Sequence, residues 1–368
     1  MAAADVLIIG GGAIGLAIAL ELQLCGASVT VLSRDFAQAA SHAAAGMLAP
    51  QAEMIATGAM RELCLLSRSL YPDWTQKLEA LTGLSTGYWA CGILAPMYRK
   101  DKGERIKDET TDSSVIMQPS EFLDRTAIHQ HQPGLSQEVS GGWWYPDDAQ
   151  VDNRLLTKAL WTAVREVGVD LREGVSVETI LQQNQRITGV QTSSGIMQSE
   201  QYVLATGAWS QTLLSIPVTP RKGQMLSVRV PAGQQELPLQ TVLFGSEIYI
   251  VPRRDGRIVI GATSEGVGFT PNNTPEGVQM LLERATRLYP ALRQFPLQET
   301  WWGFRPATPD ELPLLGASPY DNLTLATGHY RNGILLAPIT AQLLADRLWH
   351  QHSHPLLDAF HWLRFKVE

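Results

Sequence analysis

The chain has 368 residues, of which 45% are hydrophobic and 18% are charged, and its formal net charge is −7. The apolar content excludes global disorder, and the acidic balance argues against general binding to the phosphate backbone of a nucleic acid. The length predicts two domains or one large one. Cys25, Cys64 and Cys91 form no CxxC pair, so we expect no disulfide framework and no thiolate metal site, and a reducing compartment fits.

An uncharged apolar run extends from Val6 to Leu20. It is shorter than the roughly 20 residues needed to span a bilayer, Asp5 precedes it and glycines interrupt it. We therefore expect neither a signal peptide nor a membrane span, and a cytoplasmic protein.

Residues 5–33 predict a βαβ unit, with a strand over 5–9, a helix that ends near Gly26 and a strand over 28–32. Further helices are predicted over 61–80, 154–167, 274–289 and 338–349. Strands are predicted over 175–180, 187–192, 202–205, 225–230, 247–251 and 257–260. We expect an exposed loop over 100–114, a cap at Asp152, and inward-facing Leu66 and Leu155 in their helices.

The turn between the first strand and helix carries a GxGxxG pattern over 10–15. Gly10 permits a tight turn, Gly12 lets the backbone approach a pyrophosphate, and Gly15 lets the helix pack closely. The helix N-terminus offers N–H groups and a partial positive charge, so the pattern predicts a dinucleotide site.

The end of the second strand lacks the acidic residue that usually holds the ribose. Asp35 is one candidate for this role. Ser33 and Arg34 instead resemble a site for a 2′-phosphate, which would indicate NADP, and Ser33 alone would make a weaker hydrogen bond to the ribose.

Five further segments resemble the D-amino-acid oxidase superfamily of FAD-dependent amine oxidoreductases, and within it the glycine oxidases. They read AAAGMLAP over 43–50, VLATGAWS over 203–210, YIVPR over 249–253, GFRP over 303–306 and GHYRNGILLAP over 328–338. The small residues at 43–46 suit a backbone that approaches a bulky ring. The last helix could direct its positive end at the N1–C2=O edge of a flavin.

The resemblance implies an α/β protein with a Rossmann-like FAD-binding domain and a second, α+β domain that carries an antiparallel sheet. The FAD-binding domain is expected over 1–84, 143–215 and 303–368, and the substrate domain over 85–142 and 216–302. The cysteines all lie before residue 92, which argues against covalent flavin attachment late in the chain.

The resemblance also implies which residues hold FAD. The implied cofactor-binding residues are Gly10, Gly12, Ala13, Ile14, Gly15, Ser33, Arg34, Ser41, Ala45, Gly46, Met47, Val177, Gly207, His329, Tyr330, Arg331, Asn332, Gly333, Ile334 and Leu335. We expect the backbone of His329 to matter more than its imidazole. His350, His352 and His354 are read as a solvated tail, and no metal is expected.

Arg305 is the implied anchor for a substrate carboxylate, because a guanidinium binds a carboxylate in a bidentate fork. A surface ion pair with Asp310 or Glu311 is the alternative. Tyr249 is expected to assist the carboxylate or close the pocket, and Arg331 is expected beside flavin and substrate.

The implied reaction is FAD-dependent oxidation of glycine, and also of sarcosine and small D-amino acids, by hydride transfer from Cα to flavin N5. The products are glyoxylate, ammonia and hydrogen peroxide, with a role in thiazole formation for thiamine. Some glycine oxidases have a methionine where this chain has Ser264, so the substrate preference stays open.

Two other functions stay open at this point, a D-amino-acid dehydrogenase with an acceptor other than oxygen and a non-catalytic NADP-binding protein. The expected partners are a small amino acid, further copies of the chain in a homo-oligomer, and a thiazole synthase. Neither nucleic acid nor membrane is expected.

Overall fold

The computed structural model describes residues 4–98, 120–234 and 236–365, so the loop predicted over 100–114 lies outside the described residues. Six strands form the first sheet in the order β18-β19-β12-β1-β2-β8. β18 pairs antiparallel with β19, and the other neighbours pair in parallel. The strands are β1 (Ala4–Ile9), β2 (Val29–Ser33), β8 (Asp170–Glu173), β12 (Ser199–Leu204), β18 (Leu314–Ala317) and β19 (Leu323–Thr327).

Side-chain alternation in β1 builds two cores, one on each face of this sheet. Val6 and Ile8 pack against helices, whereas Leu7 and Ile9 face the opposite side. The helices on the first face are α1 (Ala13–Leu24), α3 (Ala59–Thr82), α5 (Asn153–Glu166) and α8 (Ala337–Trp349). A three-stranded antiparallel sheet covers the other face and contains β9 (Val177–Gln183), β10 (Arg186–Thr192) and β11 (Gly195–Met197).

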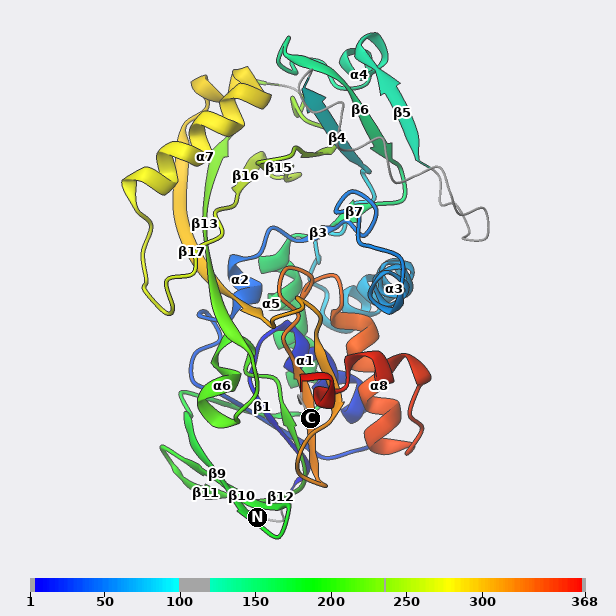
Figure 1. Cartoon of the computed structure of the whole chain (residues 1–368), viewed down its shortest axis with the longest axis vertical. Coiled ribbons are helices and arrows are strands. Elements are labelled where there is room, and N and C mark those ends of the chain that lie inside the picture. Colours follow the sequence, from blue (N-terminus) through cyan, green and yellow to red (C-terminus); the bar gives the residue numbers. More distant parts are fainter. Residues whose placement is uncertain (1–3, 99–119, 235, 366–368) are drawn as a thin grey trace.

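A second sheet lies above the first in Figure 1 and has the order β17-β13-β16-β15-β14-β4-β6-β5. It is antiparallel except where β14 pairs in parallel with β4. Its strands are β4 (Ile93–Tyr98), β5 (Glu121–Asp124), β6 (Val139–Tyr145), β13 (Thr219–Arg229), β14 (Val242–Phe244), β15 (Tyr249–Pro252), β16 (Arg257–Gly261) and β17 (Leu297–Ala307).

The two faces of the second sheet have different partners. Its outer face packs against α4 (Arg125–His131) and α7 (Pro275–Leu288). Its inner face packs against the segment Ala45–Ala52, which directs this face toward the cofactor segment of the sequence. The short elements are α2 (Ala40–Ala43), α6 (Ser210–Leu213), β3 (Met47–Leu48), β7 (Ala149–Gln150), η2 (Gly207–Trp209), η3 (Pro290–Gln294), η4 (Pro355–Phe360) and η5 (Trp362–Phe365).

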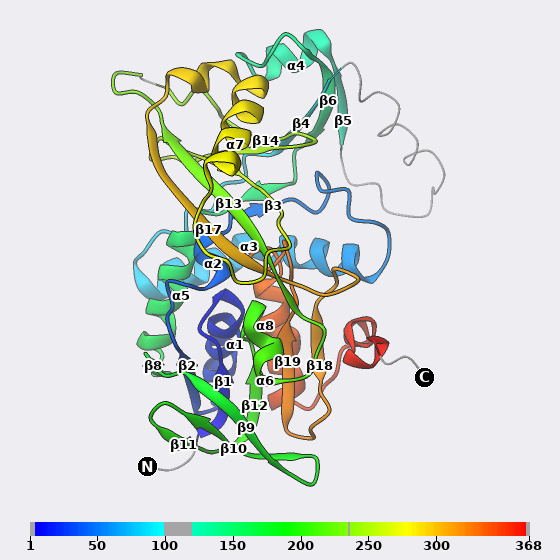
Figure 2. The same cartoon turned by 60° about the vertical axis from the view of Figure 1, so that its left-hand side comes forward.

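Two long strands, β13 and β17, pair along their whole length and run from the second sheet down beside the first (Figure 2). The predicted domain boundaries remain a prediction. β6 crosses the boundary predicted at 142/143, and β17 crosses the one predicted at 302/303.

The predicted helices and strands are confirmed within a few residues of their ends, except that the strand predicted over 225–230 is the second half of β13, which begins at Thr219. Asp152 caps α5 by accepting from the N–H groups of Arg154 and Leu155. The inward orientation of Leu66 and Leu155 is wrong, since these side chains are 41% and 39% exposed. In α3 the buried stripe instead includes Ser67 and Tyr71, whose hydroxyls donate to backbone carbonyls of residues 334 and 335. Hydroxyls with buried acceptors can take core positions that a count of apolar residues assigns to leucine.

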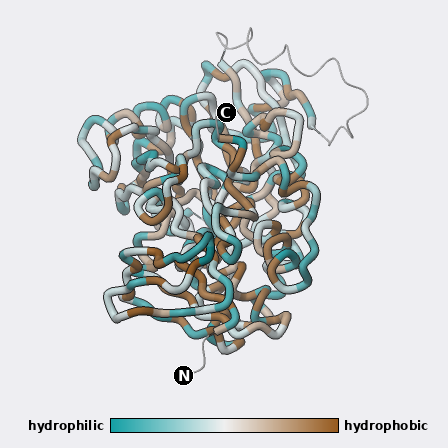
Figure 3. The backbone as a smooth tube through the Cα atoms, turned by 60° about the horizontal axis from the view of Figure 1, so that its bottom comes forward, coloured by the Kyte–Doolittle hydropathy of each residue, from teal (hydrophilic) through white to brown (hydrophobic). Residues whose placement is uncertain are grey.

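Hydrophobic stretches concentrate along the inner strands and helices, and hydrophilic ones follow many outer loops (Figure 3). Within the described ranges, no helix is long and apolar enough to cross a membrane.

Candidate active site

A cavity of about 450 Å³ lies between the first sheet and the inner face of the second. Its wall includes the predicted cofactor and substrate residues, with three exceptions, Gly15, Asn332 and Leu335. Segments far apart in the sequence therefore meet at one site, and they fall into a dinucleotide end, a central segment and a substrate end.

The glycine turn forms the dinucleotide end. Gly10 has φ +119°, and a Cβ there would lie 2.3 Å from the carbonyl oxygen of Ala205. A Cβ on Gly15 would lie 1.9 Å from the carbonyl oxygen of Gly10, so glycine at position 15 allows α1 to pack closely against the turn, behind the cavity wall. The N–H of Ala13, the first residue of α1, makes a long 3.4 Å hydrogen bond to Ser41 Oγ. This helix N-terminus fits a pyrophosphate.

Three neighbouring residues line the place expected for the ribose. Ser33 is buried, and Arg34 donates to Gln38 at 3.2 Å and lies 5.3 Å from the Trp209 ring centroid. Asp35 accepts from the N–H of Ala37 at 2.8 Å, so one of its carboxylate oxygens already has a hydrogen bond within the local turn.

The central segment runs over 41–47 and is tightly enclosed. Gly46 has φ +73°, and a Cβ there would lie 2.0 Å from the carbonyl oxygen of Val151. A Cβ on Gly303 would lie 2.4 Å from Ala43 Cβ. Glycine at both positions is what allows strand β17 and the loop before α5 to approach this segment.

The loop before α8 forms the opposite wall. His329 is 2% exposed, its Nε2 lies 3.2 Å from Thr340 Oγ1, and burial lowers the pKa of its imidazole to about 3. The ring is therefore neutral and acts in packing. Asn332 donates its N–H to the carbonyl of His329, and Leu335 accepts from Ser67, so both lie behind the wall and shape the turn.

Arg305 and Tyr249 form the substrate end. The guanidinium of Arg305 stands over Gly223, where a Cβ would lie 2.4 Å from Nη1, and donates to the carbonyl of Thr263 at 3.0 Å. Asp310 pairs instead with Arg364 at 2.7 Å, so the predicted surface alternative of an Arg305–Asp310 pair is not formed. One N–H group of Arg305 is thus held by a carbonyl, and the guanidinium lines the cavity. This arrangement suits the binding of a substrate carboxylate by its other N–H groups.

The hydroxyl of Tyr249 lies 3.1 Å from Met225 Sδ. Burial raises the pKa of this hydroxyl, while the nearby Arg305 opposes that rise. The phenol is therefore protonated at neutral pH and can donate a hydrogen bond. Arg331 also lies on the wall, although it is exposed, and its guanidinium lies 5.0 Å from the ring of Tyr330.

Glu53 is a wall residue that the sequence did not reveal. Burial raises the pKa of its carboxyl to about 7, and the charges of Arg331 and Arg305 limit that rise. A lone glutamate in a loop has no spacing signal, so only the fold shows that it faces two arginines.

A buried ion pair holds the loop that carries Glu53. Asp148 accepts from the N–H of Ala52 at 2.8 Å and from Arg68 Nη1 at 2.6 Å. Arg68 also donates to Gln51 at 2.6 Å. Burial raises the pKa of Asp148 to about 6 despite the cation beside it.

The described residues contain no group of three or more His, Cys, Asp or Glu that could hold a metal. In the C-terminal segment, His354 instead accepts from the N–H of Leu356 at 3.2 Å and begins η4.

Comparison with known proteins agrees with this geometry. The family model described as "FAD dependent oxidoreductase", called DAO, matches residues 5–347. The chain belongs to the DAO family. The description of this family favours FAD over the NADP-binding alternative. The turn at 10–15, the helix N-terminus behind it and the enclosed segment over 41–47 fit FAD.

Among curated proteins, the chain is 63% identical over 366 residues to the bifunctional protein ThiO/ThiG of Trichormus variabilis, covering 99% of this chain and 55% of that protein. The chain thus spans about half the length of this relative. It is also 35% identical to the glycine oxidase of Geobacillus kaustophilus, covering 93% of this chain and 92% of that one.

The crystal structure of the Geobacillus kaustophilus glycine oxidase matches the fold with a TM-score of 0.93 and 34% identity, over the full length of both chains. The Rossmann-like sheet combined with a second, antiparallel sheet is therefore confirmed as the architecture.

Proposed function

We propose that this DAO-family chain oxidises glycine to the imine, which water converts to glyoxylate and ammonia, and that oxygen accepts the two electrons to give hydrogen peroxide. The observation that carries the proposal is the placement of Arg305 and Tyr249 on the wall that also contains the central segment over 41–47. The full-length likeness to glycine oxidases supports it.

The residues of the substrate end have distinct tasks. Arg305 binds the carboxylate, and the protonated Tyr249 hydroxyl donates to the same group. Together they orient Cα in the cavity, since a fixed carboxylate leaves the amino acid little freedom. FAD bound beside this end of the cavity would supply the acceptor for the hydride from Cα.

The decisive experiment is an anaerobic absorbance titration of the purified protein with glycine, followed by admission of air. We expect the flavin band to bleach with glycine and to return in air with formation of peroxide. A band that glycine leaves unchanged would contradict glycine as the substrate, and sarcosine and small D-amino acids would be tested next. Bleaching without peroxide in air would contradict oxygen as the acceptor.

We infer that the imine also supplies thiazole formation, with a thiazole synthase as the receiving partner. The joining of ThiO and ThiG in the name of a relative 63% identical to this chain supports this inference. Co-purification with a ThiG protein, and glycine-dependent thiazole formation by the mixture, test it. We further propose that the chain forms a homo-oligomer, which light scattering of the purified protein would check.

A further inference from the structure

The backbone over 41–46 directs its carbonyl oxygens to donors of the protein. The side-chain amide of Asn153 donates to the carbonyls of Ser41 at 2.7 Å and His42 at 3.0 Å. The N–H of Val151 donates to the carbonyl of Gly46 at 2.8 Å. These three bonds come from the loop and first turn that begin α5.

Two further donors come from the second sheet. Trp301 Nε1 donates to the carbonyl of Ala43 at 3.1 Å, and Arg253 Nη2 donates to the carbonyl of Ala45 at 2.6 Å. Five of the six carbonyls over 41–46 thus have protein donors. The N–H groups of His42 and Ala44 bond to the carbonyls of Ala39 and Ala40. Because the five acceptors are occupied, the segment offers the cavity its methyl groups and its remaining N–H groups rather than partial negative charge.

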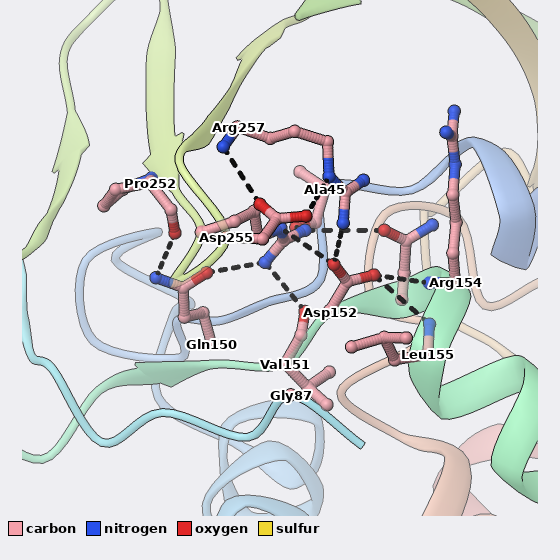
Figure 4. A network of polar contacts seen from close by, with 12 residues as sticks. Ala45, Gly87, Gln150, Val151, Asp152, Arg154, Leu155, Pro252, Asp255 and Arg257 are labelled. Carbon is pink, nitrogen blue, oxygen red and sulfur yellow. Dashed lines mark hydrogen bonds and ion pairs between the residues drawn. The ribbon is translucent and has the colours of Figure 1, made fainter. Parts of the chain in front are cut away.

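Arg253 is the charged member of this set. It follows β15, is 4% exposed, and also donates to Gln150 Oε1 at 2.5 Å and to the carbonyl of Val151 at 3.0 Å. Figure 4 shows Ala45, Gln150 and Val151 close together, and Arg253 donates to all three. One side chain of the second sheet therefore fixes both the central segment and the loop before α5.

The charge of Arg253 is balanced by Asp152, whose Oδ2 lies 3.7 Å from Arg253 Nε. Arg257 shares this carboxylate at 2.5 Å and also pairs with Asp255 at 2.7 Å (Figure 4). The contacts of Arg257 thus belong to the same ion-pair network but do not include the segment over 41–46. This difference makes Arg257 a matched control for Arg253.

We propose that Arg253 is a positioning residue for the flavin, which holds the Ala45 carbonyl away from the cavity and so keeps an electropositive backbone face toward the ring. This deepens the proposed function and rests on it for the location of the flavin along the cavity. A carbonyl released from Arg253 would turn its partial negative charge toward a group that gains negative charge on reduction.

The test compares the flavin-loaded variants R253M, R253K and R257M. The measurements are the FAD dissociation constant from flavin fluorescence on dilution, and the flavin midpoint potential from equilibration with redox dyes. We expect R253M to weaken FAD binding about tenfold and to shift the potential to a more negative value, since a charged hydrogen bond is lost. R257M should stay within about threefold in affinity and keep the wild-type potential.

R253K retains the cation and thus serves if R253M fails to fold. A single ammonium cannot reach every acceptor that the guanidinium of Arg253 serves, so an intermediate potential is expected. Equal loss of affinity in R253M and R257M, with the potential unchanged in R253M and R253K, would overturn the proposal and leave Arg253 a structural residue. Neither readout requires turnover, so lack of glycine oxidation by the wild type would overturn the proposed function without altering this comparison.

Discussion

The orientation of the charged side chains at the substrate end depends on the residues that pack around them. Arg305 has room to stand because residue 223 on the neighbouring strand β13 is glycine, and one of its donors is held by a backbone carbonyl. A preoriented guanidinium loses little freedom when a carboxylate binds.

Replacement of Arg305 by leucine should therefore lower kcat/KM for glycine by about 10- to 100-fold, since charged hydrogen bonds to the carboxylate are lost. Steady-state peroxide release measures this effect. The matched control is R221L, because Arg221 is the exposed cross-strand neighbour of Arg305 and lies off the cavity wall. A similar loss in both variants would show that the effect arises from the strands rather than from substrate binding.

Glu53 should make anion binding depend on pH. The pKa of its carboxyl is about 7, so below pH 7 it is mostly protonated and the charges of Arg305 and Arg331 are less opposed. Above pH 7 the carboxylate forms and repels an anion. Acetate, which is ionised throughout, should bind about three- to tenfold more weakly at pH 8 than at pH 6, as read from the flavin spectrum.

E53Q should bind acetate equally at both pH values, because glutamine does not titrate. E311Q is the control, since Glu311 is exposed and off the wall, although it also acts electrostatically on Arg331. A persistent pH dependence in E53Q would assign the titration to another group.

The sequence predicted site residues where a motif marks them and missed them where none does. The GxGxxG turn, Arg305 and Tyr249 have defined spacing or resemblance. Glu53 is a single acid in a loop. The sequence analysis assigned no role to Arg253 in the YIVPR segment. The role proposed above depends on its hydrogen bond to the carbonyl of Ala45, which lies about 200 residues away in the chain.

At the scale of elements, helix ends connect packing to the site. Asp152 caps α5 and also serves as the counterion of Arg253 and Arg257. Asp124 caps α4 on a more exposed surface and accepts from the N–H of Ala127. The two caps thus have similar backbone roles but different electrostatic ones.

D152A should lower the free energy of unfolding by about 3–5 kcal/mol, because it leaves the buried Arg253 without its counterion, takes one of two counterions from the half-buried Arg257 and removes a cap. D124A should lower it by about 1 kcal/mol. Urea denaturation followed by circular dichroism measures both. If both variants lost a similar free energy of unfolding, Asp152 would act only as a helix cap and not also as a counterion.

G46A should cost about 3 kcal/mol of unfolding free energy and weaken FAD binding, because φ +73° disfavours alanine and its Cβ would meet the Val151 carbonyl. G58A is the control, since Gly58 also has positive φ but its Cβ would meet nothing within 4 Å. Thermal melts with and without added FAD separate the two contributions. Equal effects of G46A and G58A would attribute the loss to backbone conformation alone.

Most elements were predictable because apolar periodicity reports local burial. The orientation of Leu66 and Leu155 was not, since the partner surface decides which side of a helix is buried. In α3 that surface is the loop before α8, whose carbonyls accept the hydroxyls of Ser67 and Tyr71. No local count contains this information.

For the whole molecule, one pair of strands of the second sheet, β13 and β17, extends down beside the first sheet (Figure 2). β13 and β17 carry Gly223 and Arg305 at the cavity and continue into the outer half of the second sheet. Resemblance predicted the two sheets. The domain boundaries stay a prediction, because β6 and β17 run through two of them and the sequence has no mark where a long strand passes from one layer to the next.

Because β13 and β17 extend from the second sheet along the first, we expect the FAD-loaded protein to unfold in one calorimetric transition, and added FAD to raise its Tm. Two separate transitions, with only the first dependent on FAD, would show that the halves unfold independently.

The paired strands also bear on how the flavin reaches its place. A hinge opens where a few loop residues can change direction, whereas β13 and β17 are hydrogen-bonded to each other from Thr219 to Val228. Exchange of the flavin would then have to wait for local unfolding, which is far slower than diffusion. A folded polypeptide of this design should therefore lose its colour only slowly on dilution, and regain it only slowly when FAD is added.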